Sequence, residues 1–331
     1  MRVITNTRGL PNSRGSRPGQ GRRTAPRLVV LGDLALDVAL KPARPLVDGT
    51  DVPGTVTLRQ GGSAASTARW LARLGASSTL ICSVGRDGPG RALVAALRDD
   101  DVIVRAVRPA GSRTARIGIV IDRTTGERSF VADRSAADRL APGDLQVAWF
   151  ERAVVLHLPA YSLLGSPLVD TALAAVELAR AAGARVSVDL ASAGPLLANG
   201  RRAAHGLISR VGPDLLFTNA HEAAAFVGGP DLSVLLRFAP VAIVKRGPAG
   251  ATVLGRGAVA GAPVRFDVAT TPLAAADTTG AGDAFDAGFL AAWAAVPVAD
   301  ALGPAVLRRA VAAGHRTAAR QLSTVRPELV F

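Results

Sequence analysis

The feature that most constrains the fold is a regular alternation of short β-branched runs with longer runs rich in Ala, Leu and Arg, which begins at Arg27. Short apolar runs bounded by turn residues are typical of buried strands, whereas apolar residues at helical spacing are typical of helices that pack on a sheet. The two alternate in this way when helices cover a mostly parallel sheet. The sequence therefore predicts an α/β fold with a mostly parallel central sheet flanked by helices.

Individual strands and helices can be assigned from this pattern. The predicted strands are RLVVLG, STLICSVG, AVVLHLP, ARVSVDLA, DLLFTN and VAIVKRG, and the predicted helices are STARWLARLG, GRALVAALRDD and PLVDTALAAVELARAAG. Gly75 follows the first of these helices, where a glycine commonly ends a helix. Cys82 is the only cysteine and lies in a predicted buried strand, which excludes an internal disulfide and a cysteine-based metal site.

Two segments, residues 38–60 and 113–134, interrupt the alternation. The second contains TTGE between two runs of alternating polarity, which indicates a hairpin turn. We predict that the two segments together form a small β-lid at the edge of the α/β body.

The N-terminal segment differs in composition from the rest of the chain, whose formal net charge is +13. Every charged residue before Asp33 is an arginine, and residues 1–26 are rich in Gly, Pro and Ser. We interpret residues 1–26 as a disordered basic tail and residues 27–331 as one domain. Such a tail could attract nucleic acid or an anionic membrane by charge alone, but a solvated extension is the simpler interpretation.

Apolar runs in the chain are short. The run near residues 289–299 is interrupted by Pro297, and no other run approaches the roughly 18–20 residues that a membrane helix needs. The tail lacks the apolar core of a secretory signal. We therefore expect a cytoplasmic protein with neither a membrane nor a specific nucleic-acid partner.

The string ADTTGAGDAF, residues 276–285, lies between a strand-like run and an apolar helix-like run. It places Gly280, Ala281 and Gly282 where a loop enters a helix, and Asp283 in the first helical turn. A helix start binds anions through its free N–H groups, and glycines let a phosphate approach them. An acid there can take a proton from an alcohol that attacks a phosphoryl group, although it can also simply complement the helix dipole.

The longer string DTTGAGDAFDAGFL resembles the C-terminal signature of the ribokinase-like (PfkB) family of carbohydrate kinases. GGSAASTARWLARLG resembles its N-terminal signature, and the resemblance extends over nearly the whole chain after the tail. It implies a three-layer ribokinase-like fold and transfer of the γ-phosphate of ATP to a sugar hydroxyl. In that reaction Asp283 would be the catalytic base, and the amides of residues 280–283 would form the anion hole.

On the acceptor side, the resemblance implies that Asp37 binds substrate hydroxyls and that Gly61 and Gly62 let the backbone approach the sugar. Without the resemblance, Asp37 is an ordinary loop acid and the glycines form a turn at a helix start. Ser66 stands where the family usually has Asn, a residue that commonly contacts substrate. This departure leaves the identity of the sugar open.

On the nucleotide side, Asn219 and Glu222 match the family's NxxE motif, which implies that they orient Mg²⁺ and phosphate, with Glu222 acting partly through water. The same pair is a capping box, and both interpretations can hold. Lys245, Gly247 and Thr278 match positions that line the ATP site. A lysine at a strand end is, however, often only solvated.

Further implied roles are less specific. Asp277 and Thr279 match positions that help to bind a monovalent cation such as K⁺ in some members of the family. Asp189 is the only part retained of an Asp, Asn and Arg arrangement after its strand. Arg134 either faces the substrate or is an exposed arginine. Lids in this family sometimes form dimer contacts, so a homodimer through the lid is included among the expectations.

Three alternatives to a sugar kinase differ in substrate or in class. The substrate could be a nucleoside such as adenosine, since related kinases phosphorylate a ribose attached to a base. Phosphosugars are disfavoured because relatives that use them often have Lys after the glycine pair, where this chain has Ser63. A catalytically weak sensor of sugar or nucleotide is disfavoured by the retention of Asp283 beside an intact glycine loop.

Overall fold

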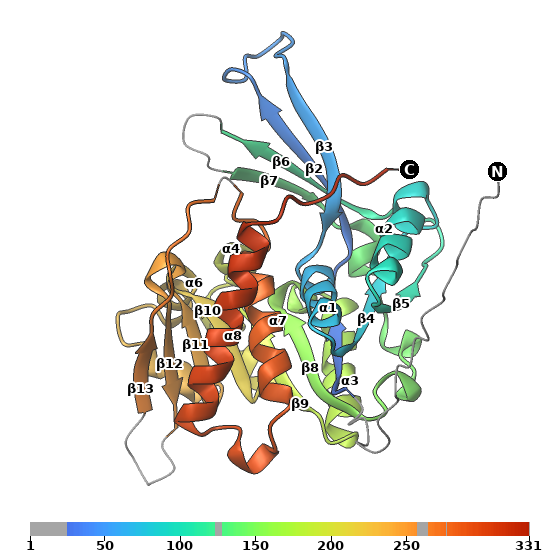
Figure 1. Cartoon of the computed structure of the whole chain (residues 1–331). Helices are drawn as coiled ribbons and strands as arrows, with labels where there is room; N and C mark the ends of the chain where they lie inside the picture. Colours follow the sequence, from blue (N-terminus) through green and yellow to red (C-terminus); the bar gives the residue numbers. More distant parts are fainter. Residues whose placement is uncertain (1–24, 123–127, 257–263, 276, 331) are drawn as a thin grey trace, which may run out of the picture.

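The computed structural model describes residues 25–122, 128–256, 264–275 and 277–330 (Figure 1). The predicted tail, except for its last two residues, and the predicted TTGE turn lie outside these ranges. Within the described ranges, no helix is both long enough and apolar enough to cross a membrane.

The body is built on a nine-stranded sheet in the order β13-β12-β11-β10-β9-β8-β1-β4-β5. Neighbouring strands are parallel from β5 to β11, and β12 and β13 continue the sheet in antiparallel fashion. The bounds are β1 Arg27–Leu31, β4 Ser77–Ser83, β5 Ile103–Val107, β8 Ala153–Pro159, β9 Arg185–Asp189, β10 Leu215–Asn219, β11 Val241–Lys245, β12 Ala251–Gly255 and β13 Val264–Val268.

Helices cover both faces of this sheet (Figure 1). Their bounds are α1 Ser63–Arg73, α2 Gly88–Asp99, α3 Leu168–Ala181, α4 Ala193–Leu196, α5 Arg201–Val211, α6 Ala220–Val227, α7 Ala281–Ala294 and α8 Pro304–Leu322. Successive strand residues point to opposite faces. Leu28 and Val30 accordingly join the core under α1, α2, α7 and α8, while Val29 and Leu31 join the core under α3, α5 and α6. The predicted three-layer α/β fold is therefore confirmed.

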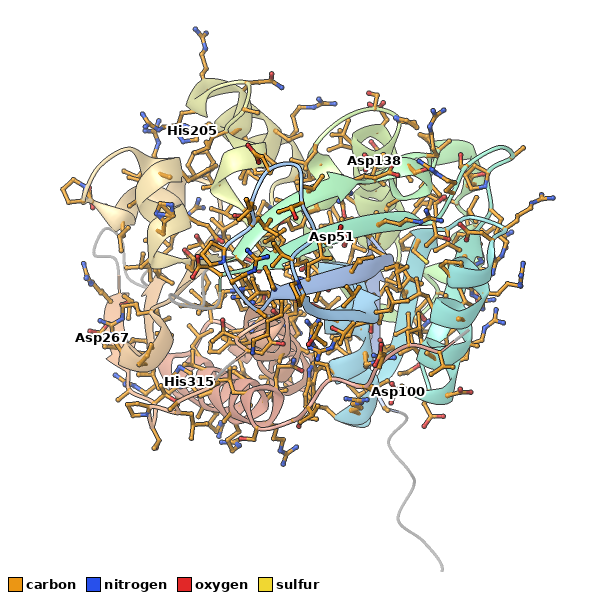
Figure 2. All side chains as sticks on the ribbon, turned by 90° about the horizontal axis from the view of Figure 1, so that it is seen from above. Asp51, Asp100, Asp138, His205, Asp267 and His315 are labelled. Carbon is orange, nitrogen blue, oxygen red and sulfur yellow. The ribbon has the colours of Figure 1, made fainter. Side chains whose placement is uncertain are left out.

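A second, four-stranded sheet rises from one end of the body, in the order β3-β2-β6-β7 (Figure 1). Its strands are β2 Ala35–Pro42, β3 Gly54–Gly61, β6 Ala115–Ile121 and β7 Arg128–Asp133. These strands largely coincide with the two segments that interrupt the sequence alternation, although β2 begins at Ala35 and β3 ends at Gly61, outside the predicted bounds of 38–60. Seen from above, the sheet lies over the centre of the body, with Asp138 and His315 on opposite sides of it (Figure 2). We call this sheet the lid.

The structure differs from the predicted strands at three places. The predicted strand RLVVLG forms β1, but β2 begins only four residues after it, so Asp37 lies in a lid strand and its interpretation as a loop acid is wrong. The edge strand β5 was not predicted. Strands β12 and β13 were also missed, because a tight turn reverses the chain after β11: the Arg246 N–H donates to Gly250 O over 2.8 Å, and Gly250 has a φ of 86°.

Candidate active site

Polar residues gather where the parallel strands of the body end. Asp33 follows β1, while Asp189, Asn219 and Lys245 are the last residues of β9, β10 and β11. The carboxyl ends of parallel strands lie along one edge of a sheet, which is where α/β proteins bind ligands. Because β1 leads into β2 at this edge, the lid stands over the same end of the body.

The N-termini of α1 and α7 meet at this edge. Each helix begins after a glycine with positive φ, 97° at Gly62 and 77° at Gly280. Asp283, in the first turn of α7, accepts a 2.5 Å hydrogen bond from the Ser63 hydroxyl at the start of α1. From the sequence, Ser63 served only as evidence against a phosphosugar substrate. Its contact with Asp283 was missed because the two residues lie 220 positions apart in the sequence.

The predicted anion hole also lies at the start of α7. Gly282 and Asp283 belong to its first turn, and the Ala281 N–H donates to Thr278 O over a long 3.3 Å. The helix dipole places partial positive charge here. This arrangement brings the predicted catalytic residues Gly280, Ala281, Gly282 and Asp283 into a single turn.

The environment of Asp283 favours a proton acceptor that works near neutral pH. Burial raises the pKa of Asp283 to about 7, although the hydrogen bond from Ser63 lowers it. Asp189 raises this pKa further, and the positive charge of Lys245 lowers it. A general base is most effective when its pKa is close to the working pH.

Two buried carboxylates, Asp33 and Asp37, lie against the start of α1 and the glycines that precede it. Asp33 accepts the Ala64 N–H over 3.2 Å, and its backbone contacts Gly62, where a Cβ would lie 2.4 Å from Asp33 O. A Cβ at Gly61 would lie 1.9 Å from Asp37 Oδ1. The predicted glycine pair therefore makes room for these two acids. Burial raises the pKa of Asp37 to about 6.

Two other predicted residues lie near these acids. Arg134 is half-buried, 3.6 Å from Asp33 Oδ2 and 2.7 Å from Asp138 Oδ1, so its interpretation as an exposed arginine is wrong. Ser66, one turn into α1, lines a small cavity with Gln60 and Gly280. Its contact with substrate stays a prediction. Asp33 itself was missed, because it lies in the short connection between β1 and β2, where no local pattern marks it.

A cavity of about 230 Å³ lies beside the start of α7. It is lined by the predicted residues Lys245, Gly247 and Thr278, by Ala281 and Gly282, by the loop of residues 270–273 and by His315 and its neighbours on α8. The lining is mostly apolar, which suits the flat ring of a nucleotide base. Its opening onto Gly282 suits a phosphate chain that reaches the helix start.

Asn219 and Glu222 form a complete capping box at the start of α6 and are absent from the cavity lining. The Glu222 N–H donates to Asn219 Oδ1 over 2.8 Å, and Glu222 Oε2 accepts the Asn219 N–H over 2.8 Å. The Asn219 amide donates to Glu222 Oε1 over 2.6 Å. Burial, followed by the nearby Asp189, raises the pKa of Glu222. The capping interpretation is therefore confirmed, and the role toward magnesium stays a prediction.

Lys245 is not solvated, contrary to the simpler interpretation of a strand-end lysine. Its Nζ lies 3.0 Å from Asp189 Oδ2 and 3.1 Å from Asp286 Oδ1, and the side chain of Asp286 is fully buried. Burial opposes the charge on Lys245, but the two carboxylates outweigh it and raise the pKa of Lys245. A Cβ on Gly282 would lie 3.6 Å from Nζ, so this ammonium lies just beneath the predicted anion hole.

Asp277 and Thr279, predicted to help to bind a monovalent cation, contact arginines instead. Asp277 lies 3.4–3.5 Å from the guanidinium groups of Arg59, Arg128 and Arg326. Arg128 also donates to the hydroxyl of Thr279. Positive charge already surrounds the Asp277 carboxylate, so in this arrangement the two residues do not fit a cation site.

The model of the pfkB family carbohydrate kinases matches residues 25–326, which is most of the chain. The chain belongs to this family. As a PfkB carbohydrate kinase it is a phosphotransferase with an alcohol group as acceptor, and the resemblance stated from the two signatures is confirmed.

Curated relatives and solved structures agree with this assignment. The PfkB chain is 34% identical over 286 residues to a fructokinase of Klebsiella pneumoniae, which covers 83% of this chain and 87% of the relative. Adenosine kinase from Sinorhizobium meliloti has a TM-score of 0.78 at 22% identity and covers 93% of this chain and 97% of its own. Fructokinase from Vibrio cholerae O395, in a fructose-, ADP- and calcium-bound form, has a TM-score of 0.73 at 23% identity, with coverages of 90% and 92%. At these identities the two structures show the shared fold.

Proposed function

We propose that this PfkB kinase transfers the γ-phosphate of ATP to a hydroxyl of a neutral sugar, with Asp283 as the general base. The observation that carries the proposal is the place of Asp283. Its neighbours Ala281 and Gly282 line the nucleotide cavity, while its hydrogen-bond partner Ser63 begins the helix that follows the acceptor-side glycines. An alcohol held beside Asp283 would face a phosphate at the start of α7.

In the proposed reaction, Asp283 takes the proton of the attacking hydroxyl as the new oxygen–phosphorus bond forms. The start of α7 and the Lys245 ammonium beneath it supply positive charge where negative charge builds up on the transferred group. The lid over this end of the body would exclude water, which could otherwise attack ATP in place of the alcohol.

Asp33 and Asp37 favour a polyhydroxyl acceptor, because ionised carboxylates accept hydrogen bonds and do not donate them. Two arginines lie next to this pair and both are already engaged, Arg134 by Asp33 and Asp138 and Arg326 by Asp37 and Asp277. An acceptor carboxylate or phosphate would therefore have to compete with these carboxylates for either arginine, which favours a neutral sugar. Fructose is the first candidate, since the Klebsiella relative is a fructokinase. A nucleoside is the second candidate, on the fold shared with the Sinorhizobium adenosine kinase.

Magnesium fits the oxygen ligands that Asn219 and Glu222 present, and these residues would hold it through water. When bound, Mg²⁺ supplies charge neutralisation on the nucleotide phosphates.

We retain three further proposals: a basic tail at residues 1–26, a cytoplasmic location and a homodimer formed through the lid.

The test is an ADP-release screen with ATP and Mg²⁺ over fructose, ribose, a keto-deoxy sugar acid and adenosine. We expect turnover with fructose or another neutral sugar. Turnover with adenosine alone would replace sugar by nucleoside as the substrate. ATP binding without turnover of any alcohol would overturn the proposal in favour of a sensor.

Gly61→Ala tests the acceptor side separately. The new Cβ would overlap the Asp37 carboxylate, so the acid must move, and we expect the KM for the acceptor to rise about tenfold or more, the loss typical of a removed hydrogen bond to a charged group. The KM for ATP should stay the same. Gly206→Ala is the matched control, because a Cβ at this helical glycine meets no other atom within 4 Å. An unchanged acceptor KM in Gly61→Ala would remove Asp37 from the site.

The pH dependence of turnover tests the base. Asp283 must be ionised to accept a proton, and burial raises its pKa to about 7. We therefore expect kcat/KM for the acceptor to rise with pH and to level off above about pH 7. A profile that is flat from pH 5 to pH 8 would contradict a base with this pKa.

A further inference from the structure

Three arginines from separate parts of the chain converge on Asp277, in the loop that leads into α7. Arg59 comes from β3 and lies 3.4 Å from Asp277 Oδ2. Arg128 comes from β7, on the other edge of the lid, and lies 3.5 Å from Oδ1. Arg326 comes from the segment after α8 and lies 3.5 Å from Oδ2. We call these three residues the arginine clasp.

Arg128 holds the loop by more than its ion pair. One of its guanidinium nitrogens donates to Thr278 Oγ1 over 2.8 Å, and the other donates to the hydroxyl of Thr279. Asp277 Oδ1 in turn accepts the Thr279 N–H over 2.9 Å. The residue after Thr279 is Gly280, which caps α7, so one lid arginine fixes the approach to the predicted anion hole.

Arg326 joins the same loop to the acceptor side. Its second nitrogen lies 3.4 Å from Asp37 Oδ2, and its side chain is only 18% exposed. Farther along the same segment, the Leu329 N–H donates to Leu58 O of β3 over 2.7 Å (Figure 1). The segment after α8 is therefore attached to the lid at two points, one of which touches the loop.

The charges at this point leave little room for a metal cation. A monovalent ion at Asp277 and Thr279 would face three guanidinium groups around one carboxylate, and like charges at such distances repel. A guanidinium offers the same positive charge, and its fixed planar donors can bind a carboxylate and two hydroxyls at once. An ion has no attachment to the lid, whereas Arg59 and Arg128 are part of it.

We propose that the arginine clasp holds the lid against the loop before α7 and supplies at Asp277 the positive charge that a monovalent cation would otherwise provide. The clasp residues are positioning residues, and the proposal rests on the proposed kinase function for its catalytic consequence. It follows that this kinase needs no K⁺ for activity. It also follows that the loop before α7 becomes ordered when the lid closes, in a single event.

The first experiment compares turnover in KCl, NaCl and choline chloride at constant ionic strength. For the unaltered protein we expect rates that agree within about twofold. Arg128→Met should lower kcat/KM for the acceptor about tenfold in choline chloride, the loss typical of a removed charge-assisted hydrogen bond, and KCl should restore part of it. Arg128→Lys keeps the charge, so its kcat/KM in choline chloride should lie between the values for the unaltered protein and for Arg128→Met. Arg98→Met, at an exposed position of α2, is the matched control.

The second experiment does not depend on activity. Hydrogen–deuterium exchange of the lid strands should be faster in Arg128→Met and in Asp277→Asn than in the unaltered protein, while exchange of β8 and β9 in the body stays the same. Titration calorimetry with KCl should show no binding to the unaltered protein. A strong K⁺ requirement, measurable K⁺ binding or unchanged lid exchange in both variants would overturn the proposal. If no alcohol is phosphorylated, the kinase proposal fails, and exchange and calorimetry still test the clasp.

Discussion

Asp283→Asn is expected to lower kcat by about 10²–10⁴-fold, the range that a positioned general base contributes. The amide cannot take the proton of the attacking hydroxyl, although its oxygen can still accept the hydrogen bond from Ser63. Because the nucleotide cavity is lined by Ala281 and Gly282 and not by the Asp283 side chain, the KM for ATP should change little. Steady-state ADP release with saturating acceptor measures both quantities.

Loss of activity in Asp283→Asn should not come from loss of stability. Burial raises the pKa of Asp283 to about 7, so the folded protein holds this proton more tightly than the unfolded chain. The unfolded chain has already released it near pH 4, and the ionised, half-buried acid therefore costs stability as the pH rises from about 4 to about 7. Asp283→Asn removes this cost.

At pH 8 we therefore expect the free energy of unfolding of Asp283→Asn to equal or exceed that of the unaltered protein, as measured by urea denaturation. Asp99→Asn, at an exposed acid of α2, should change neither activity nor stability. Undiminished turnover in Asp283→Asn would remove this residue from the mechanism, and a less stable variant at pH 8 would contradict the pKa assigned to it.

Much of the body could be predicted from sequence because its signals are local. A strand such as RLVVLG is buried on both faces by residues that alternate within the strand itself, and Gly75 ends α1 with a φ of 84° that favours glycine. Strands β12 and β13 escaped prediction for a different reason. Strand β12 follows directly on the reversal after β11 and breaks the strand–helix alternation, and β13 is half-exposed at the edge of the sheet, so its apolar pattern is weak.

The candidate site divides in the same way. The glycine turn and Asp283 lie within four consecutive residues, so a single string predicts them. The partners of Asp283 and Lys245 come from distant strands and helices: Ser63 is 220 positions from Asp283, and Asp189 is 56 positions from Lys245. The sequence contains one local sign of this buried cluster, because Asp286 is an acid on the apolar face of a predicted helix. Such an acid requires a buried partner, but the sequence does not say which.

Lys245→Met is expected to lower the free energy of unfolding by about 3–5 kcal/mol, the cost of removing one partner of a buried ion pair. The variant leaves Asp189 and Asp286 buried together without a cation, 3.0 and 3.1 Å from the atom that is lost. Methionine fills most of the volume of the lysine stem, so the loss reports the missing charge and not a cavity. Chemical denaturation near pH 7 measures it.

Asp286→Asn separates the charge of this cluster from its shape. Burial, followed by the charge of Asp189, raises the pKa of Asp286 well above its ordinary value, so Asp286 holds a proton more readily than a free aspartate does. Asparagine is close in shape to a protonated aspartate and can keep its hydrogen bond to Asp189. Asp286→Asn should therefore cost far less than Lys245→Met, and most of the cost of the lysine variant must come from the unpaired charge of Asp189. If the Lys245→Met, Asp286→Asn double variant is as unstable as Lys245→Met alone, most of the loss comes from the unpaired charge of Asp189. Equal losses in the two single variants would instead mean that Asp286 is ionised, with Lys245 neutralising two charges beneath the anion hole.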